Sequence, residues 1–328
     1  MKISIFASIG SQNLWDELIL KNEIKLFEKR YKDPSFRVFS YDSEKPFYTQ
    51  DNIEYKNYFP IGIRNPKNIF KNVWSFFHLI KAAFWSDVII IWWGGLFYDW
   101  ESNNSALMQW KARVEFFNSL RRKVIFYGVS IDIRNEANYE YIRAIFSNAA
   151  EIHVRDEHSY RLLKSLGIES EVMIDPVFYD HGGKQREKNS CIKSVDSHHL
   201  TLSDFTDIDW QWKKVWVALR NVWTTGYREN IEEILQYIVS EGGEIIYLPH
   251  SFHESDKQAN DFDFLSSLPV KWYISESMKE TYGFYLQKKV DICLAQRFHS
   301  IVLSEVYEIP YIWMSYSQKT KSLLEKLS

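Results

Sequence analysis

Arg297 and His299 lie one residue apart in the stretch AQRFHSIVLSEVYEIP, where an apolar run gives way to a helical pattern. A guanidinium and an imidazole at the start of a helix could bind an anion, because a helix N-terminus also favours negative charge. The imidazole could in addition transfer a proton near neutral pH. The alternative is that two polar residues simply begin a surface helix.

Further cationic residues follow other apolar runs of the second half. Arg220 ends VWVALR and His250 ends IIYLPH. If these runs are parallel strands, their ends share one edge of a sheet, and the cations together predict an anion site suited to phosphate and carboxylate. Each residue taken alone is better explained as a structural or solvated group, and only their coincidence at strand ends favours the anion site. The pair His250 and His253 lacks helical zinc spacing and a nearby third ligand, so we predict no metal site.

The first strand-to-helix junction, ASIGSQNLWDE, carries polar residues of its own. Gly10 permits a tight turn, and Asn13 could cap the helix with Asp16 three residues later. Alternatively, Asn13, Asp16 and Glu17 could bind sugar hydroxyls or accept a proton. The spaced glycines of a dinucleotide fingerprint and of a P-loop are absent.

A pair of glycines, Gly94 and Gly95, follows another apolar run in WWGGLFYDW. Without side chains, they would let the backbone approach a ligand closely. We therefore include them among the candidate binding residues, although a single Gly-Gly pair is a weak signal.

Apolar runs and helical patterns alternate along the chain, which predicts parallel sheets covered on both sides by helices. We expect strands over residues 2–7, 35–42, 87–95, 123–131, 151–156, 170–175, 213–220, 244–250, 270–275, 290–296 and 310–316. We expect helices over residues 14–31, 65–86, 105–122, 137–149, 157–167, 228–243, 255–268, 277–288, 300–308 and 318–327.

The alternation fails only in the polar stretch around residues 181–211, which contains paired glycines. We therefore predict an N-terminal α/β domain over 1–180, a linker or loop over 181–211, and a C-terminal α/β domain over 212–328. The expected fold is two doubly wound, Rossmann-like domains facing a cleft. Ligands of such sheets bind beyond the carboxyl ends of the strands.

Composition narrows the class of protein. The 328 residues are 45% hydrophobic and 25% charged, as in soluble globular proteins. The net charge is −3, so no overall field favours nucleic acid, and we expect no such partner. Aromatic residues make up 17%, and rings of this kind either fill the core or stack on sugars.

The N-terminal apolar run is too short for a signal peptide, and polar residues interrupt the apolar region 69–97. We expect no transmembrane segment. Cys191 and Cys293 are expected to be unpaired thiols in a reducing compartment. These features predict a cytoplasmic protein, and they do not specify its oligomeric state.

The ordered motifs together resemble the polysaccharide pyruvyl transferase family. GSQNLWDE resembles the family's Gly-x-x-Asn-x-Gly-Asp-Glu loop, and WGGLF resembles its glycine-rich turn. YGVSI, VRDEHSYRLLKSLG, DPVF, VALR and YLPHSFHESD follow in the family's order. The most specific match is AQRFHSIVLSEVYEIPYIWMSYSQKTKSLLE, with Arg-x-His, a helix, Pro and Tyr-x-x-Lys.

The resemblance implies a GT-B-like fold and transfer of the enolpyruvyl unit of phosphoenolpyruvate to hydroxyls of a cell-surface polysaccharide or its precursor. It carries the donor-site role over to Arg220, Arg297 and His299. Phosphoenolpyruvate is then the donor substrate, and we expect no cofactor and no metal. The saccharide acceptor could be lipid-linked, which is compatible with a peripheral position at the inner face of the membrane.

Within this scheme, His299 is the expected general acid, because protonation of the methylene carbon suits an imidazole. Asp16 or Glu17 is the expected acceptor of the hydroxyl protons.

Two positions depart from the family pattern, since Trp15 and Trp93 stand where the family usually has glycine. Two alternatives stay open, the first because it shares the architecture and the second because of these departures. One is a GT-B glycosyltransferase that uses a nucleotide sugar, and the other is a non-catalytic relative that binds a sugar or an anion.

Overall fold

The computed structural model describes residues 1–57, 77, 79–99, 104–173, 190–222, 225–253, 260–270 and 272–315. The chain divides into two compact units. The first contains Met1–Ser11 and Asp16–Asp180, and the second contains Gln12–Trp15 and His181–Ser328. The helix expected over 318–327, the DPVF motif, and parts of the helices expected over 65–86 and 255–268 lie outside the described residues.

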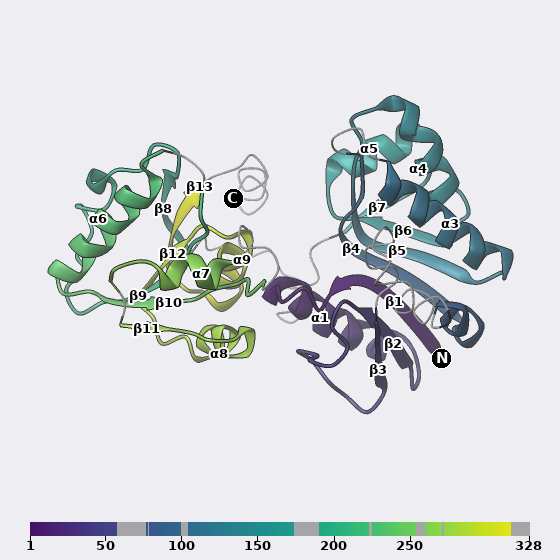
Figure 1. The fold of residues 1–328 in the computed structure, drawn as a ribbon, viewed down its shortest axis with the longest axis horizontal. Helices are drawn as coiled ribbons and strands as arrows, with labels where there is room; N and C mark the ends of the chain where they lie inside the picture. Colours follow the sequence, from purple (N-terminus) through teal and green to yellow (C-terminus); the bar gives the residue numbers. More distant parts are fainter. Residues whose placement is uncertain are drawn as a thin grey trace, which may run out of the picture. The chain divides into compact units, whose positions relative to one another are not determined.

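The first unit contains a seven-stranded sheet in the order β3-β2-β1-β4-β5-β6-β7, and every neighbouring pair of strands is parallel (Figure 1). Its strands are β1 (Lys2–Ile9), β2 (Ser35–Ser40), β3 (Ile53–Asn57), β4 (Val88–Tyr98), β5 (Lys123–Asp132), β6 (Glu151–Val154) and β7 (Glu171–Val172). The strand order reverses between β1 and β4. This reversal is the switch point of a doubly wound sheet, next to which ligands of such folds bind.

The helices of the first unit follow the sequence pattern. Those with both ends among the described residues are α1 (Leu14–Arg30), α3 (Ser105–Ser119), α4 (Tyr139–Phe146) and α5 (Glu157–Ser165), with a short 3-10 helix η3 (Glu136–Asn138), and residues 79–85 are also helical. On α3, the buried residues Leu107, Trp110, Val114 and Phe117 recur every three or four positions and pack into the core cluster. This spacing gives α3 one apolar face, which covers the sheet at β4 and β5.

The glycine pair lies inside a strand, which continues past the end expected at residue 95 and takes the place of the glycine-rich turn that the family resemblance implies. β4 runs through Gly94 and Gly95 to Tyr98, and its register with β5 shifts between Gly94 and Phe97. An irregularity of this kind disturbs the ladder locally, and glycine is tolerated there because it has no side chain to pack.

The second unit contains a six-stranded sheet in the order β11-β10-β9-β12-β13-β8, again with only parallel pairs. Its strands are β8 (Cys191–Asp196), β9 (Lys214–Ala218), β10 (Glu244–Tyr247), β11 (Tyr273–Ile274), β12 (Ile292–Ala295) and β13 (Tyr311–Ser315). Its helices are η5 (Leu202–Asp204), α6 (Tyr227–Ser240), α7 (Asp261–Ser266), α8 (Met278–Gln287) and α9 (Phe298–Tyr307). The order reverses between β9 and β12, which is the switch point of this sheet.

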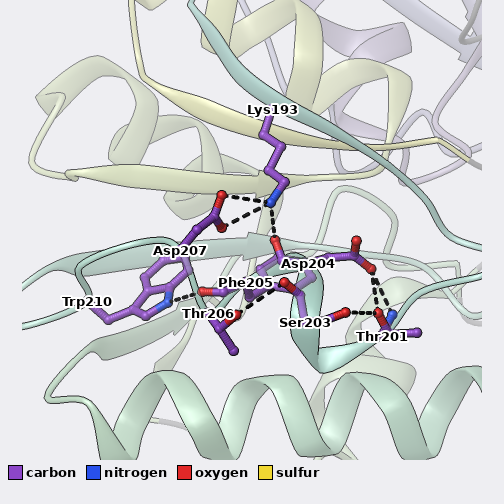
Figure 2. Close-up of polar contacts among 8 residues, drawn as sticks. All are labelled: Lys193, Thr201, Ser203, Asp204, Phe205, Thr206, Asp207 and Trp210. Carbon is purple, nitrogen blue, oxygen red and sulfur yellow. Dashed lines mark hydrogen bonds and ion pairs between the residues drawn. The ribbon is translucent and has the colours of Figure 1, made fainter.

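The region 181–211 is more than a linker, which corrects the predicted domain boundaries. Among its described residues, β8 pairs with β13 and extends the second sheet. Lys193 Nζ then binds the Asp207 carboxylate at 3.0 and 3.1 Å and the Asp204 carbonyl at 2.7 Å (Figure 2). Trp210 Nε1 donates to the Phe205 carbonyl at 3.0 Å, and its ring is part of the core. Residues 190–211 are therefore an integral part of the second unit.

Within the described residues, no helix combines the length and the apolar character needed to cross a membrane.

Two tryptophans, one inside the region 181–211 and one directly after it, can test whether this region is part of the folded second unit. Trp210 is 1% exposed and Trp212 is 81% exposed. We expect Trp210→Ala to lower the free energy of unfolding by about 3–5 kcal/mol, because it removes a packed ring and a buried hydrogen bond. Trp212→Ala should change it by less than about 0.5 kcal/mol. Urea denaturation measures both, and equal small effects would mean that the stretch is a loose connection.

Candidate functional site

The switch point of the second unit brings Arg220 and Arg297 to one edge of the sheet. Each residue follows the last residue of its strand, β9 or β12, by two positions. The backbone nitrogens of Gln296 and Arg297 donate to the Ala218 carbonyl at 3.2 and 3.4 Å, and Arg220 N donates to Gln296 Oε1 at 2.8 Å. Gln296 is fully buried, and its amide nitrogen binds two further hydroxyls. The two arginine positions are therefore fixed relative to one another.

Arg297 is paired with a carboxylate that the sequence analysis missed. Its Nε donates to Asp261 Oδ1 and Oδ2 at 2.9 and 2.8 Å, and its Nη2 also binds Oδ1. Asp261 opens α7 and is 1% exposed. Burial raises the pKa of Asp261, and the charges of Arg297 and Arg220 oppose this shift. Asp261 therefore occupies the Nε–Nη2 edge of Arg297, and this edge cannot make the anion contact that the sequence predicts for Arg297.

His250 lies beside Arg297 but carries no charge near neutral pH. The residue is 1% exposed, and its Nε2 is 3.0 Å from the Tyr285 hydroxyl on α8. Burial, and secondly the Arg297 charge, lower the pKa of His250 to about 3. This lowered pKa disfavours the cationic form that the sequence analysis expects of His250. A neutral imidazole there provides a hydrogen-bonding group instead.

His299, in the first turn of α9, is half-buried among aromatic rings. The Trp15 ring stacks on it with centroids 4.7 Å apart and an interplanar angle of 10°. Phe298 stands edge-on at 6.0 Å, and the His250 ring centroid is 6.4 Å away. The structure thus brings His250, Arg297 and His299 together and adds Trp15.

Trp15 reaches this site because the segment Gln12–Trp15 belongs to the second unit. Leu14 N donates to the His250 carbonyl at 3.0 Å, and Phe252 N donates to the Gln12 carbonyl at 3.0 Å. Asn13 forms an antiparallel bridge with Ser251. Its Oδ1 also accepts from Trp15 N at 3.1 Å, so Asn13 caps α1.

At the switch point of the first unit, Glu17 is the distinctive group. It is 2% exposed, and its Oε1 accepts from the backbone nitrogen of Gly10 at 2.9 Å. Burial raises the pKa of Glu17 to about 7. Its Oε2 is buried with no hydrogen-bond partner among the described residues. By contrast, Asp16 is half-buried and accepts from Ser11 Oγ at 3.4 Å.

Gly10 holds this junction in a conformation that few other residues tolerate. Its φ is +77°, and a Cβ added there would lie 2.2 Å from Ser40 Oγ and 2.5 Å from Asp42 N. The tight turn directs the Gly10 nitrogen toward Glu17, so the hydrogen bond between them fixes the positions of both the loop and the carboxyl group.

In the described part of the chain, no three His, Cys, Asp or Glu side chains cluster closely enough to hold a metal ion. Cys191 is half-buried and Cys293 is buried, and both carry thiols.

A sequence model of the family described as polysaccharide pyruvyl transferase matches residues 16–318, nearly the whole chain. The chain belongs to the polysaccharide pyruvyl transferase family. The resemblance drawn from the ordered motifs is thereby confirmed, and the protein is a transferase of this family. Comparison with curated protein sequences found no match.

Solved structures with a similar fold include sugar-nucleotide enzymes. UDP-GlcNAc 2-epimerase from Neisseria meningitidis has a TM-score of 0.53 and 13% identity, over 99% of this chain and 85% of that one. S. aureus MnaA with UDP has a TM-score of 0.53 and 11% identity, over 99% of this chain and 81% of that one. A ugt transferase from Siraitia grosvenorii has a TM-score of 0.52 and 10% identity, over 100% of this chain and 84% of that one. At these identities the likeness concerns the fold, and it confirms two Rossmann-like domains of GT-B type.

Sequence reasoning missed three residues that organise the site, namely Asp261, Tyr285 and Gln296. Gln296 ends the run DICLAQ, and an amide residue directly after a predicted buried strand could have been recognised as a candidate site residue. Asp261 and Tyr285 lie inside helical patterns, where nothing local distinguishes them from other helix residues.

The buried ion pair can be tested with two substitutions. Arg297→Met leaves Asp261 buried without its partner, so we expect the free energy of unfolding to fall by about 3–5 kcal/mol. The double variant Arg297→Met/Asp261→Asn should recover most of this loss. Arg161→Met is the control, because its ion pair with Glu157 is exposed and worth less than about 1 kcal/mol. Additive effects of the two site substitutions in urea denaturation would contradict the pairing.

The raised pKa of Glu17 predicts a pH-dependent stability. A carboxyl whose pKa rises from 4.5 to about 7 on folding favours the folded state below pH 4.5, and this contribution is lost as the pH rises through 7. Relative to Glu17→Gln, the wild type should therefore lose about 3 kcal/mol between pH 4.5 and pH 8. Urea denaturation of both proteins across this range measures the difference. A constant difference would show that Glu17 titrates normally.

Proposed function

We propose that this protein transfers the enolpyruvyl unit of phosphoenolpyruvate to two hydroxyls of a saccharide, leaving a pyruvate ketal. Membership of the family supports a saccharide acceptor belonging to a polysaccharide or its precursor. The observation that carries the proposal is the gathering of Arg220, Arg297 and His299 at the switch point of one domain. We infer no cofactor, and phosphoenolpyruvate is the only other small molecule required.

The donor carries a phosphate and a carboxylate, so its binding needs several positive groups. Arg220 provides one guanidinium, and the first turn of α9 adds the partial positive charge of a helix N-terminus. Asp261 neutralises much of the Arg297 charge through the Nε–Nη2 edge of that guanidinium. We therefore assign the main anion contact to Arg220 and a weaker, second contact to Arg297. His250, which is neutral, is assigned a hydrogen-bonding role.

His299 is the proposed general acid. Protonation of the methylene carbon turns it into a methyl group and leaves a cation at the carbon that bears the phosphate. One acceptor hydroxyl adds to this carbon, and the second replaces the phosphate group. Of the two hydroxyl protons, one balances the proton given to carbon and the other leaves with phosphate.

A carboxylate is needed to accept the hydroxyl protons, and the two candidates differ. Glu17 has a pKa of about 7, so it exchanges protons readily in the neutral range. Asp16 is half-buried and hydrogen-bonded to Ser11. We assign the role to Glu17, because a group that titrates near neutral pH can both accept and release a proton in each turnover.

A second candidate function follows from the structural relatives. The S. aureus and Siraitia grosvenorii structures contain UDP, and a diphosphate would also suit a helix N-terminus with nearby arginines. A nucleotide-sugar glycosyltransferase would be stabilised by uridine diphosphate rather than phosphoenolpyruvate in a thermal shift assay. A non-catalytic relative would bind a ligand without turnover.

The main test measures phosphate release from phosphoenolpyruvate with a panel of glycosides. We expect His299→Gln to lower kcat by about 100-fold or more, since general acid catalysis contributes this much. Arg220→Met should raise the KM for phosphoenolpyruvate by about 10- to 100-fold, because it removes a charged hydrogen-bonding group. The control is Arg228→Met, an exposed arginine of α6 that pairs with Glu232. If the wild type neither binds nor consumes phosphoenolpyruvate, the proposed function is wrong.

A further inference from the structure

We propose that Trp15 is a positioning residue for His299, and that its indole ring fixes the orientation of the imidazole. The proposed consequence for the transfer reaction rests on the function assigned above. The stacking itself can be measured without any reaction.

The contact is the closest of the ring contacts described for His299. The two ring centroids are 4.7 Å apart and the planes differ by 10°, so the indole covers one face of the imidazole. Phe298 meets His299 at 87° and meets Trp15 at 90°, with centroids at 6.0 and 5.8 Å. The three rings brace one another, which is the offset and edge-on geometry that aromatic groups prefer.

The indole is itself held in place through the backbone that carries it. The backbone nitrogen of Trp15 donates to Asn13 Oδ1 at 3.1 Å, and the preceding residue, Leu14, donates to the His250 carbonyl at 3.0 Å. Trp15 is 2% exposed. A stacking partner anchored in this way is rigid, and it can restrict the side chain that it covers.

This restriction matters because the imidazole of histidine rotates easily about its last side-chain bond. A half turn about this bond exchanges the position of Nδ1 with that of Cδ2, and the position of Nε2 with that of Cε1. Such a turn would drive the His299 ring edge through the Trp15 indole. The stack therefore fixes whether a nitrogen or a carbon of the ring faces a ligand, and it blocks approach from one face of the imidazole.

The first arm of the experiment is an NMR measurement of the free protein. Histidine labelled with ¹³C gives ring signals for the nine histidines, and His299→Gln identifies those of His299. We expect His299 signals shifted upfield by the indole in the wild type, with cross-peaks to Trp15. Trp15→Leu should remove the shift, and Trp15→Phe should retain part of it. Unchanged His299 signals in Trp15→Leu would overturn the stack.

The second arm separates positioning from stability. Trp15→Leu should lower kcat by about 10- to 100-fold with little change in the KM for phosphoenolpyruvate, since misplacement of a reacting group has an effect of this size. Trp15→Phe should restore most of the activity. Trp210→Phe, a buried tryptophan of the same domain outside the site, should reduce the melting temperature while leaving kcat unchanged.

The outcomes distinguish this proposal from the function on which it rests. A wild type inactive with phosphoenolpyruvate but with shifted His299 signals refutes the proposed function and retains the stack. A lost NMR shift in Trp15→Leu with unchanged kcat overturns the positioning role. Equal loss of kcat in Trp15→Leu and Trp15→Phe also overturns it, because a stacked ring would then be irrelevant.

Discussion

The buried pair of Arg297 and Asp261 is the interaction on which the second domain's site depends. It joins the start of α9 to the start of α7, and Asp261 also accepts from the His250 backbone nitrogen at 3.3 Å. The β10–α7 and β12–α9 connections therefore meet at one carboxylate. Two charges removed from water are stable only when they are paired this closely. The same pairing that holds the loops in place also leaves less positive charge on Arg297 for a ligand, and for this reason the main anion contact is proposed for Arg220.

The two domains share one topology but carry groups of different charge near the switch point. In each sheet the strand order reverses next to a central strand, β1 or β9, and polar side chains lie where the chain leaves this strand or a neighbouring strand. In the first domain the group at this place is a carboxyl, Glu17, which burial keeps close to half-protonated near pH 7. In the second domain the groups are guanidiniums and imidazoles. Burial acts on both kinds by disfavouring charge, so it raises the pKa of Glu17 and lowers that of His250.

Much of the fold could be predicted because buried parallel strands are continuous apolar runs. The strands at the switch points, such as VIII of β4 and VWVA of β9, are of this kind. The strands that were missed, β3 and β8, lie at sheet edges and mix polar with apolar residues. An edge strand needs no apolar run, because one of its sides has no neighbouring strand to bury it. The positions of the site residues were likewise predictable from strand ends, but their states were not. The charge of His250 depends on burial and on Arg297, and the partners Asp261 and Trp15 are distant in sequence from the groups that they contact.

The path of the backbone makes the second domain discontinuous. The chain enters it at Gln12, leaves after Trp15, and returns for good after Asp180. A gene fragment starting at codon 181 would therefore encode a domain without the strand-like segment that pairs with residues 250–252 and without the ring that covers His299. A chimera that joins the N-terminal half of one relative to the C-terminal half of another would combine residues 12–15 of the first with a second domain from the other. Such a chimera therefore needs residues 12–15 from the same relative as its C-terminal half.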